Sequence, residues 1–201
     1  KSEFDQLNIN DMLSDMDTIT EQAQYLSHTI DDFRNFIKNT DDKNRISILK
    51  TIDKALSIVH SSIKNNNITL ILDLKYDLII DGFENQLIQA IINIINNAKD
   101  ALNEKEKLED KYLFITTKEV NNDLVLTIKD NAGGIKKDIL LKIFEPYFTT
   151  KHQSIGTGLG LSISHQIIKE HHNATIEVTN KSYTYQEKQY AGACFQITFK
   201  T

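Results

Sequence analysis

Apolar residues recur at helical spacing in the first forty residues of the chain. Their spacing of alternating four and three residues is a heptad pattern, and a turn at residues 39–42 follows it. The seam comprises Met12, Met16, Ile19, Ala23, Leu26, Ile30, Phe33 and Ile37. A single helix with such a seam needs a partner, which is either an unseen helix or a second copy of the chain. Packing on the chain's own domain is the alternative, and we predict dimerisation.

Two further amphipathic helices are predicted, and both are shorter than the first. The first of them has its apolar stripe at Ile48, Ile52, Ala55, Leu56, Val59 and Ile63. The second runs from Glu84 to Leu102, with a stripe at Leu87, Ile91, Ile94, Ile95, Ala98 and Leu102. Weaker patterns predict helices at 136–143 and 159–171.

Alternating apolar and polar positions predict the strands. A strand is expected from Ile68 to Leu74 and a short one from Tyr76 to Ile80. A hairpin is expected at 112–117 and 124–129, and a last pair at 176–179 and 192–200 around a polar loop, 180–189. Strands and helices do not alternate regularly, which predicts an α+β fold: a mixed sheet covered on one face by helices. We place the domain boundary near 65–67, between a helical stalk (1–66) and a second domain (67–201).

Composition narrows the classes of protein. The chain has 201 residues and a formal net charge of −5, which argues against a broad nucleic-acid surface. Its one cysteine, Cys194, has the context of a small apolar strand residue, and no disulfide can form within the chain. Neither a signal peptide nor a membrane-spanning run is evident in the sequence. We therefore expect a cytoplasmic fragment.

Glycine is concentrated in one stretch. The chain has seven glycines, and five of them lie in two clusters between residues 130 and 161. Glycine lets the backbone approach a ligand closely, and a glycine loop that leads into a helix offers free N–H groups to phosphates. The stretch therefore predicts a nucleotide or phosphate site, with a flexible linker as the alternative for the second cluster. Asp130, at a strand end, could accept a hydrogen bond from an exocyclic amine or could simply form a turn.

Asparagines interrupt the helix predicted from Glu84. Asn93 and Asn97 are four residues apart, so their amides point the same way, although asparagine is a poor residue for a helix interior. Amide oxygens are hard ligands that suit Mg²⁺. A magnesium site is thus one reading, and a solvated face in an asparagine-rich chain is the other.

Four segments together resemble the motifs of a known family. They are an N box (Asn93–Ala98), a first G box (Asp130–Ile135), an F box (Ile143–Lys151) and a second G box (Gly156–Leu161). In this order and spacing they are similar to the catalytic, ATP-binding part of sensor histidine kinases, in the superfamily shared with gyrase, heat-shock chaperone ATPases and MutL. The resemblance covers residues 81–201 and implies a two-layer ATP-binding sandwich preceded by a helical dimerisation stalk.

The resemblance also implies residue roles, with ATP and Mg²⁺ as cofactors. Asn97 would bind Mg²⁺ with Asn93 on the phosphate side, while Asp130 would hold the adenine amine and Gly134 would allow close approach to the base. Residues 146–156 would form a lid. The phosphates would lie against Gly156, Thr157, Gly158, Leu159 and Gly160. Two positions depart from the family: Ala132 replaces a usual glycine, and Asp100 stands where many members have a lysine near the phosphates. Lys99 is adjacent in sequence but lies about 100° away around the helix, and Lys151 is a candidate for the γ-phosphate.

The first predicted helix also resembles part of the family, but the phosphoacceptor histidine expected beside it is not found. Residues 19–37 resemble the second helix of the dimerisation and phosphotransfer hairpin. The phosphoacceptor histidine expected on the first helix of that hairpin is missing, since neither His28 nor any other histidine has the required acid and proline context. The resemblance implies transfer of the ATP γ-phosphoryl group to a histidine outside this sequence, with a response-regulator receiver domain as partner, a homodimer through the N-terminal helices, and a membrane-bound parent sensor. A nucleotide-gated dimerisation module and a serine-directed kinase of the same superfamily are the alternatives.

Overall fold

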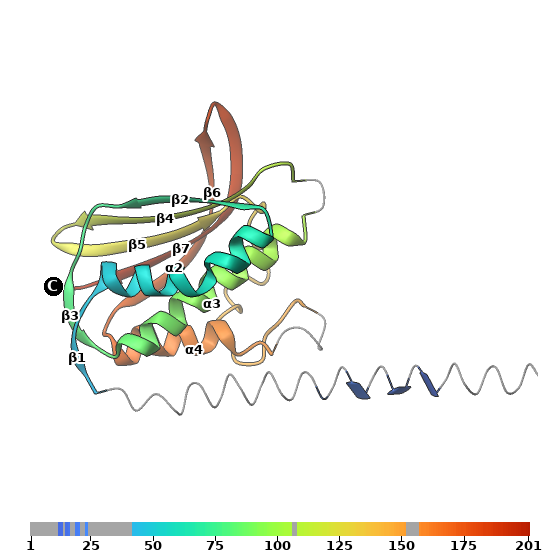
Figure 1. Ribbon diagram of the computed structural model, residues 1–201, viewed down its shortest axis with the longest axis horizontal. Helices are drawn as coiled ribbons and strands as arrows, with labels where there is room; N and C mark the ends of the chain where they lie inside the picture. The colour runs from blue at the N-terminus through green and yellow to red at the C-terminus, as the bar shows by residue number, and fades with distance from the viewer. Residues whose placement is uncertain are drawn as a thin grey trace, which may run out of the picture.

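The computed structural model describes residues 12–13, 15–16, 19–20, 23, 42–105, 108–151 and 157–201. Its helices and strands alternate irregularly along the chain (Figure 1). In order, they are β1 (Asn44–Ser47), α2 (Ile48–Asn65), β2 (Ile68–Leu74), β3 (Ile79–Gly82), α3 (Glu84–Asn103), β4 (Lys111–Val120), β5 (Asp123–Asp130), α4 (Gly160–Gln166), the π-helical turn η1 (Ile167–His171), β6 (Thr175–Tyr185) and β7 (Lys188–Phe199).

Five strands form one mixed sheet in the order β2-β4-β5-β7-β6. The pair β2–β4 is parallel, and the other neighbours are antiparallel. Helices α2, α3 and α4 lie on one face of this sheet (Figure 1), and β1 pairs with β3 in a separate ribbon. The predicted α+β fold, a mixed sheet covered on one face by helices, is confirmed. Within the described residues, no helix combines the length and apolar character needed to cross a bilayer.

The core lies between the helices and the sheet. Every second residue of β5 from Leu124 to Asp130 is buried, as the pleat requires, and α3 buries the stripe that its spacing predicted. Each such Leu or Ile side chain that leaves water contributes roughly 1.5–3 kcal/mol before entropy is counted. The sheet and α3 are thereby fixed relative to each other, which is what positions the ends of β5 and α3.

Helix α2 packs in this same core. Ser47 caps its N-terminus by accepting a hydrogen bond from Lys50 N at 3.2 Å, and its buried face includes Ile52, Leu56 and Ile63. The helix predicted from residue 48 is confirmed. The division into a stalk (1–66) and a domain (67–201) stays a prediction, with α2 packed against the residues that follow it.

Two predicted elements differ from the structure. Residues 136–143, expected as a helix, instead form consecutive hydrogen-bonded turns in which Leu141 is 90% exposed. Residues 180–189, expected as a polar loop, continue β6 and β7 instead. The two strands meet at Gln186 and Glu187, whose φ angles of 48° and 63° match the left-handed turn that suits a hairpin. The β6–β7 hairpin projects beyond its neighbours at the top of Figure 1.

Smaller differences concern element ends. The short strand expected at 76–80 begins at Ile79, and the helix expected at 159–171 changes at Ile167 from α to π geometry. His172, just after that turn, is buried against Phe83, and burial lowers the pKa of its imidazole. The contact between His172 and Phe83 connects the segment after η1 to the residue that precedes α3.

The heptad helix is described at few positions. Met12, Met16, Ile19 and Ala23 are helical and exposed, whereas the seam from Leu26 to Ile37 lies outside the described residues, as does His28. Dimerisation through this seam stays a prediction.

Candidate functional site

Asp130 ends β5 with its side chain buried. It is 2% exposed, and its Oδ1 accepts hydrogen bonds from the backbone N–H groups of Ala132 (2.8 Å) and Ala193 (3.2 Å). Burial raises the pKa of this carboxyl, and the two backbone donors oppose the rise. Both bonds to neighbouring residues use Oδ1. A buried acid with one oxygen fixed by the backbone has its second oxygen oriented as well.

The rest of the first G box is fastened to the strands around it. Asn131 Oδ1 accepts from Tyr112 N at 2.8 Å, and Asn131 Nδ2 donates to Asp110 O at 2.8 Å. Gly133 N donates to Ala191 O at 2.9 Å. This loop is therefore tied to the start of β4 on one side and to β7 on the other.

The glycines of this box are needed for different reasons. Gly133 has φ +91°, and a Cβ added there would meet nothing within 4 Å, so backbone conformation alone favours glycine. Gly134 has φ +87°, and a Cβ would lie 2.5 Å from Asn180 Oδ1. Ala132 is not among the residues with positive φ, so alanine is accommodated where the family usually has glycine.

Helix α3 meets the second glycine cluster through Asn93. Its Nδ2 donates to Gly160 O at 3.2 Å, and Asn97 Nδ2 donates to Asn93 O at 2.8 Å. Within the described part of the chain, the hydrogen bonds of both amides use their nitrogens, so both oxygens remain available to a cation. No group of three His, Cys, Asp or Glu side chains among the described residues could hold a metal. Any Mg²⁺ here would depend on amide oxygen and phosphate ligands.

Lys151 of the F box reaches α3. Its Nζ lies 2.6 Å from Asp100 Oδ2, one helical turn beyond Asn97. Lys99 lies farther from the same carboxylate, at 3.8 Å, and also contacts Ser62. The predicted γ-phosphate ligand is thus close to the predicted magnesium ligand, paired with an acid.

The second glycine cluster packs on the F box. Gly158 has φ +67°, and a Cβ would lie 2.4 Å from the carbonyl carbon of Tyr147. Tyr147 itself has φ +64°, and Thr157 Oγ1 accepts from Leu159 N at 3.3 Å. Gly158 is therefore required by protein contact. Gly156 and His152 lie outside the described residues.

Direct contacts thus join the predicted site residues into two groups. The first group is α3 with Asn93 and Asn97, together with Gly160 and Lys151, which are bonded to that helix. The second group, at the end of β5, contains Asp130 and Gly134, whereas Gly158 contacts Tyr147 of the F box. Phe144 of the F box contacts both α4 and β7, through the rings of His165 and Phe195. The ends of β5 and α3 and the start of α4 all lie toward the right of Figure 1.

Two residues that contact Asp130, Gly192 and Tyr183, were not predicted from the sequence. Gly192 faces Asp130 so closely that a Cβ would lie 1.8 Å from Asp130 O, and Tyr183 donates its hydroxyl to that same oxygen at 2.8 Å. Gly192 is one of two glycines outside the rich stretch, which was a signal in its own right. Tyr183, Tyr185 and Tyr190 lie in a segment rich in tyrosine, a residue that favours strands.

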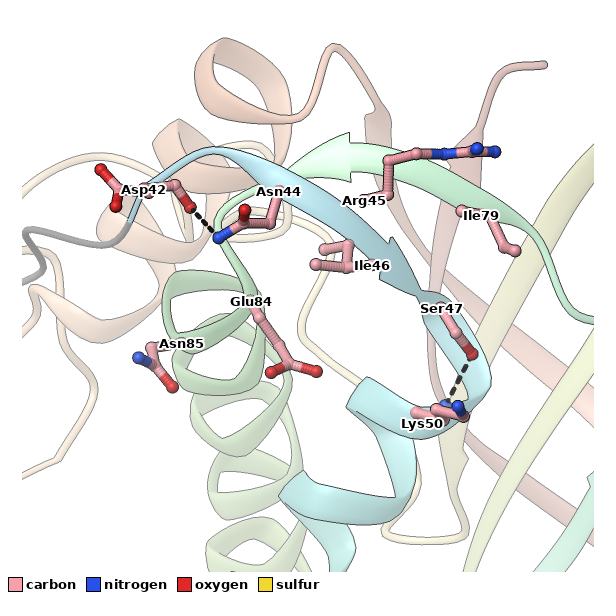
Figure 2. A pocket seen from close by; sticks show the side chains of 9 residues that line it. All are labelled: Asp42, Asn44, Arg45, Ile46, Ser47, Lys50, Ile79, Glu84 and Asn85. Atoms are coloured by element: carbon pink, nitrogen blue, oxygen red, sulfur yellow. Dashed lines mark hydrogen bonds between the residues drawn. The ribbon is translucent and has the colours of Figure 1, made fainter.

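A cavity of about 570 Å³ lies elsewhere, at the N-terminal ends of α2 and α3 (Figure 2). It is lined by Asp42, Asn44, Arg45, Ile46, Ser47, Lys50, Ile79, Glu84 and Asn85. Asn97 is thirteen residues along α3 from Glu84, roughly 20 Å away at the helical rise. None of the four motifs contributes to this cavity, so it is separate from the candidate site.

Comparison with known proteins identifies the family of the ATPase part. The family model described as "Histidine kinase-, DNA gyrase B-, and HSP90-like ATPase" matches residues 82–201. A putative sensor protein of Shewanella frigidimarina is 32% identical over 156 residues, which are 77% of this chain and 23% of the relative. Sporulation kinase A of Bacillus subtilis is 32% identical over 158 residues, 78% of this chain and 24% of that protein. The chain spans about a quarter of the length of these relatives.

Solved structures agree with the fold. The catalytic domain of histidine kinase ThkA superposes with a TM-score of 0.63 at 24% identity, covering 79% of this chain and 95% of that one. Histidine kinase ThkA in complex with the response regulator protein TrrA gives 0.64 at 21% identity, with 90% and 48% covered. The family match extends over more than half of the sequence and includes the four motifs. The chain therefore belongs to the histidine kinase-, DNA gyrase B- and HSP90-like ATPase family.

Proposed function

We propose that this chain is the catalytic part of a sensor histidine kinase, which binds MgATP and transfers the γ-phosphoryl group to a protein histidine. One observation carries the proposal: α3, which carries the N box, contacts two other motifs, since Asn93 bonds to Gly160 and Asp100 pairs with Lys151. Asp130 of the remaining motif is buried at the end of β5. Curated relatives named as sensor proteins and sporulation kinases support the same activity.

The base would be recognised by Asp130. With Oδ1 bonded to two backbone N–H groups, Oδ2 is the oxygen that would accept the 6-amino group of adenine. A buried carboxylate makes this hydrogen bond strong, since a charged acceptor contributes about 1.5–3 kcal/mol. Gly133 and Gly134 give the loop its turn through their positive φ angles, and Gly134 would allow the base to approach the backbone closely.

The phosphates would lie between α3 and the second glycine cluster. Asn97 Oδ1 would hold Mg²⁺, which neutralises phosphate charge when bound, and Asn93 would lie on the phosphate side. Gly156, Thr157, Gly158, Leu159 and Gly160 would provide backbone N–H groups. Lys151 would exchange Asp100 for the γ-phosphate, because the oxygens of both are anionic acceptors.

Phosphoryl transfer asks little covalent chemistry of these residues. The histidine nitrogen of the acceptor forms a bond to the γ-phosphorus, the bond from phosphorus to the bridging oxygen breaks, and ADP leaves. Such a reaction is accelerated mainly by alignment and charge neutralisation. A site with amides, a lysine and glycine N–H groups supplies both.

Partners follow from the same proposal. The phosphoryl group would pass to an aspartate of a response-regulator receiver domain, and the chain would form a homodimer through its N-terminal helices. A structural neighbour solved with a response regulator supports the first partner. The exposed apolar positions Met12, Met16 and Ile19 support the second. The parent protein would be a membrane-bound sensor with this part in the cytoplasm.

Calorimetry of MgATP binding tests the site. Asp130→Asn should lower the affinity about 100-fold, because a neutral amide replaces the charged acceptor. Asp123→Asn, at the opposite end of β5, is the matched control and should bind as the parent chain does. Unchanged affinity in Asp130→Asn would remove the proposed base site.

Phosphoryl transfer from ATP carrying a labelled γ-phosphate tests the activity. We expect the label on a dimerisation hairpin that carries its histidine and is supplied in trans, and none on this chain. The label should be acid-labile, as phosphohistidine is. An acid-stable label would favour the serine-directed alternative, and no transfer despite ATP binding would favour a nucleotide-gated dimerisation module.

A further inference from the structure

We propose that Asn180 and Tyr183, on the extended part of β6, are positioning residues that hold the first G box so that Asp130 discriminates for the adenine amine. The proposal rests on the proposed function, since it assumes that Asp130 recognises adenine. It adds two residues from a hairpin that lies outside the four motifs.

Asn180 binds both polar groups of one loop residue. Its Oδ1 accepts from Ile135 N at 2.8 Å, and its Nδ2 donates to Ile135 O at 2.6 Å. A side-chain amide bonded in this two-point manner fixes both the position and the tilt of the peptide groups around Ile135. The same amide occupies the space where Gly134 has no Cβ.

Tyr183 holds the other end of the loop. Its hydroxyl donates to Asp130 O at 2.8 Å, and its ring lies 3.5 Å from Lys129 Nζ and 5.4 Å from the centre of the Phe114 ring. Burial raises the pKa of Tyr183, so the phenol keeps its proton and remains a donor at neutral pH. The backbone on both sides of the Asp130 side chain is therefore restrained.

The opposite strand of the hairpin completes this arrangement. Ala191 O accepts from Gly133 N, and Ala193 N donates to the Asp130 carboxylate. Tyr183 pairs with Tyr190, and Lys181 pairs with Gly192, so the hairpin register brings all of these groups to one loop. Two successive glycines with positive φ would otherwise leave residues 133–135 with wide conformational freedom. The hairpin removes that freedom and fixes the direction of the carboxylate.

A comparison of two nucleotides tests the proposal. Purine riboside 5′-triphosphate lacks the 6-amino group but keeps the ribose and the triphosphate of ATP. Calorimetry with Mg²⁺ gives the affinity of this chain for each. We expect ATP to bind more tightly than the analogue. Asn180→Ala and Tyr183→Phe should each lower ATP affinity about tenfold and leave analogue affinity within about twofold, as expected for a weakened hydrogen bond to the amine.

Matched controls come from the same hairpin. Tyr185→Phe removes a hydroxyl that is bonded to Gln186, and Ser182→Ala removes an exposed hydroxyl, so both should keep the preference for ATP. If Asn180→Ala and Tyr183→Phe keep that preference, or lose affinity for both nucleotides equally, the positioning role is wrong. If the parent chain itself shows no preference for ATP, the assignment of Asp130 to adenine fails, and the positioning role with it.

Discussion

The two sides of the candidate site differ in how they are held. The base side, defined as Asp130–Ile135, is bonded to β4, β6 and β7 by the side chains of Asn131, Asn180 and Tyr183 and by the main chain of β7. Among the described residues, the phosphate side, defined as Lys151 and residues 157–160, contacts α3 through the Lys151–Asp100 pair and the bond from Asn93 to Gly160. Recognition of a base requires fixed hydrogen-bond directions, whereas a triphosphate tolerates adjustment because its charge is spread over many oxygens.

The energies of these contacts follow the same division. On the base side, the bonds made by the side chains of Asp130 and Asn131 to backbone N–H groups are buried, whereas those of Asn180 are exposed. A buried hydrogen bond contributes about 1 kcal/mol and costs more when one partner is left unpaired. The pair of Lys151 and Asp100 has side chains that are 23% and 36% exposed, and partly exposed pairs contribute about 0–1 kcal/mol. Breaking the Lys151–Asp100 pair therefore costs little, whereas breaking the buried bonds of Asp130 and Asn131 costs more.

The largest predicted effect is on the base side. Gly192→Ala places a Cβ 1.8 Å from Asp130 O, which is main chain and cannot rotate away. The free energy of unfolding should fall by about 3 kcal/mol or more, as in severe overpacking. Urea unfolding measures it.

Gly133→Ala is the control for this substitution. It introduces strain at φ +91° without a steric contact, so it should cost only about 1–2 kcal/mol. Equal losses from the two variants would show that contact with Asp130 is not what restricts residue 192.

The equivalent substitution on the phosphate side should act on binding more than on folding. Gly158→Ala brings a Cβ against the main chain of Tyr147, a residue that is 70% exposed, so we expect this part of the F box to shift. We expect ATP affinity to fall about tenfold, with a loss of about 1–2 kcal/mol in unfolding free energy from the positive φ. A loss of stability as large as that of Gly192→Ala would contradict the proposed difference between the two sides.

Acidification should also separate the two sides. Burial raises the pKa of Asp130, so its carboxylate takes up a proton at higher pH than an exposed aspartate does. The preference for ATP over purine riboside 5′-triphosphate should therefore shrink on acidification, at a higher pH than the titration of an exposed aspartate would require.

The stability of the nucleotide-free protein should change with pH in the opposite sense. Because the folded-state pKa is raised, the contribution of this carboxyl to stability is fully present below its unfolded pKa and is lost as the pH rises through the folded pKa. Asp130→Asn should consequently be no less stable than the parent chain at neutral pH, as thermal unfolding would measure. In the binding measurements, a preference for ATP over the analogue that does not change with pH would exclude Asp130 as the titrating group.

The smallest effect should come from Asp100→Asn. It frees Lys151 and removes a negative charge near the phosphates, so ATP affinity should rise about two- to threefold at low salt. Calorimetry at low and high salt measures the change, and the gain should shrink as salt increases. Weaker binding in this variant would mean that Asp100 serves the nucleotide directly.

Much of the fold could be predicted because its pattern is local. The stripe of α3 and the alternation of β5 repeat within a few residues, so helix and strand followed from spacing. The prediction of a helix at 136–143 was wrong because it also relied on local spacing alone. Its apolar spacing spans about two turns, too short to nucleate without further contacts, and Leu141 points into solvent.

The candidate site could be predicted only in part. Asn93, Asp130 and the glycine clusters were visible as local anomalies of composition and order. Asn180 contacts Ile135 across 45 residues of sequence, and Tyr183 contacts Asp130 across 53, so no nearby pattern indicated either one. The polar segment 180–189 contains no Gly or Asn pair that would predict a hairpin turn, so its sequence predicts a loop. The turn is made instead by Gln186 and Glu187, which are unusual residues at positive φ.

The bond from Ala193 N to the Asp130 carboxylate has a consequence for the order of synthesis. A growing polypeptide that has reached residue 180 already contains all four sequence motifs. Its Asp130 carboxylate still lacks the N–H group of β7 that orients it. Competence to bind ATP should therefore be acquired only after β7 has been synthesised and has added to the sheet.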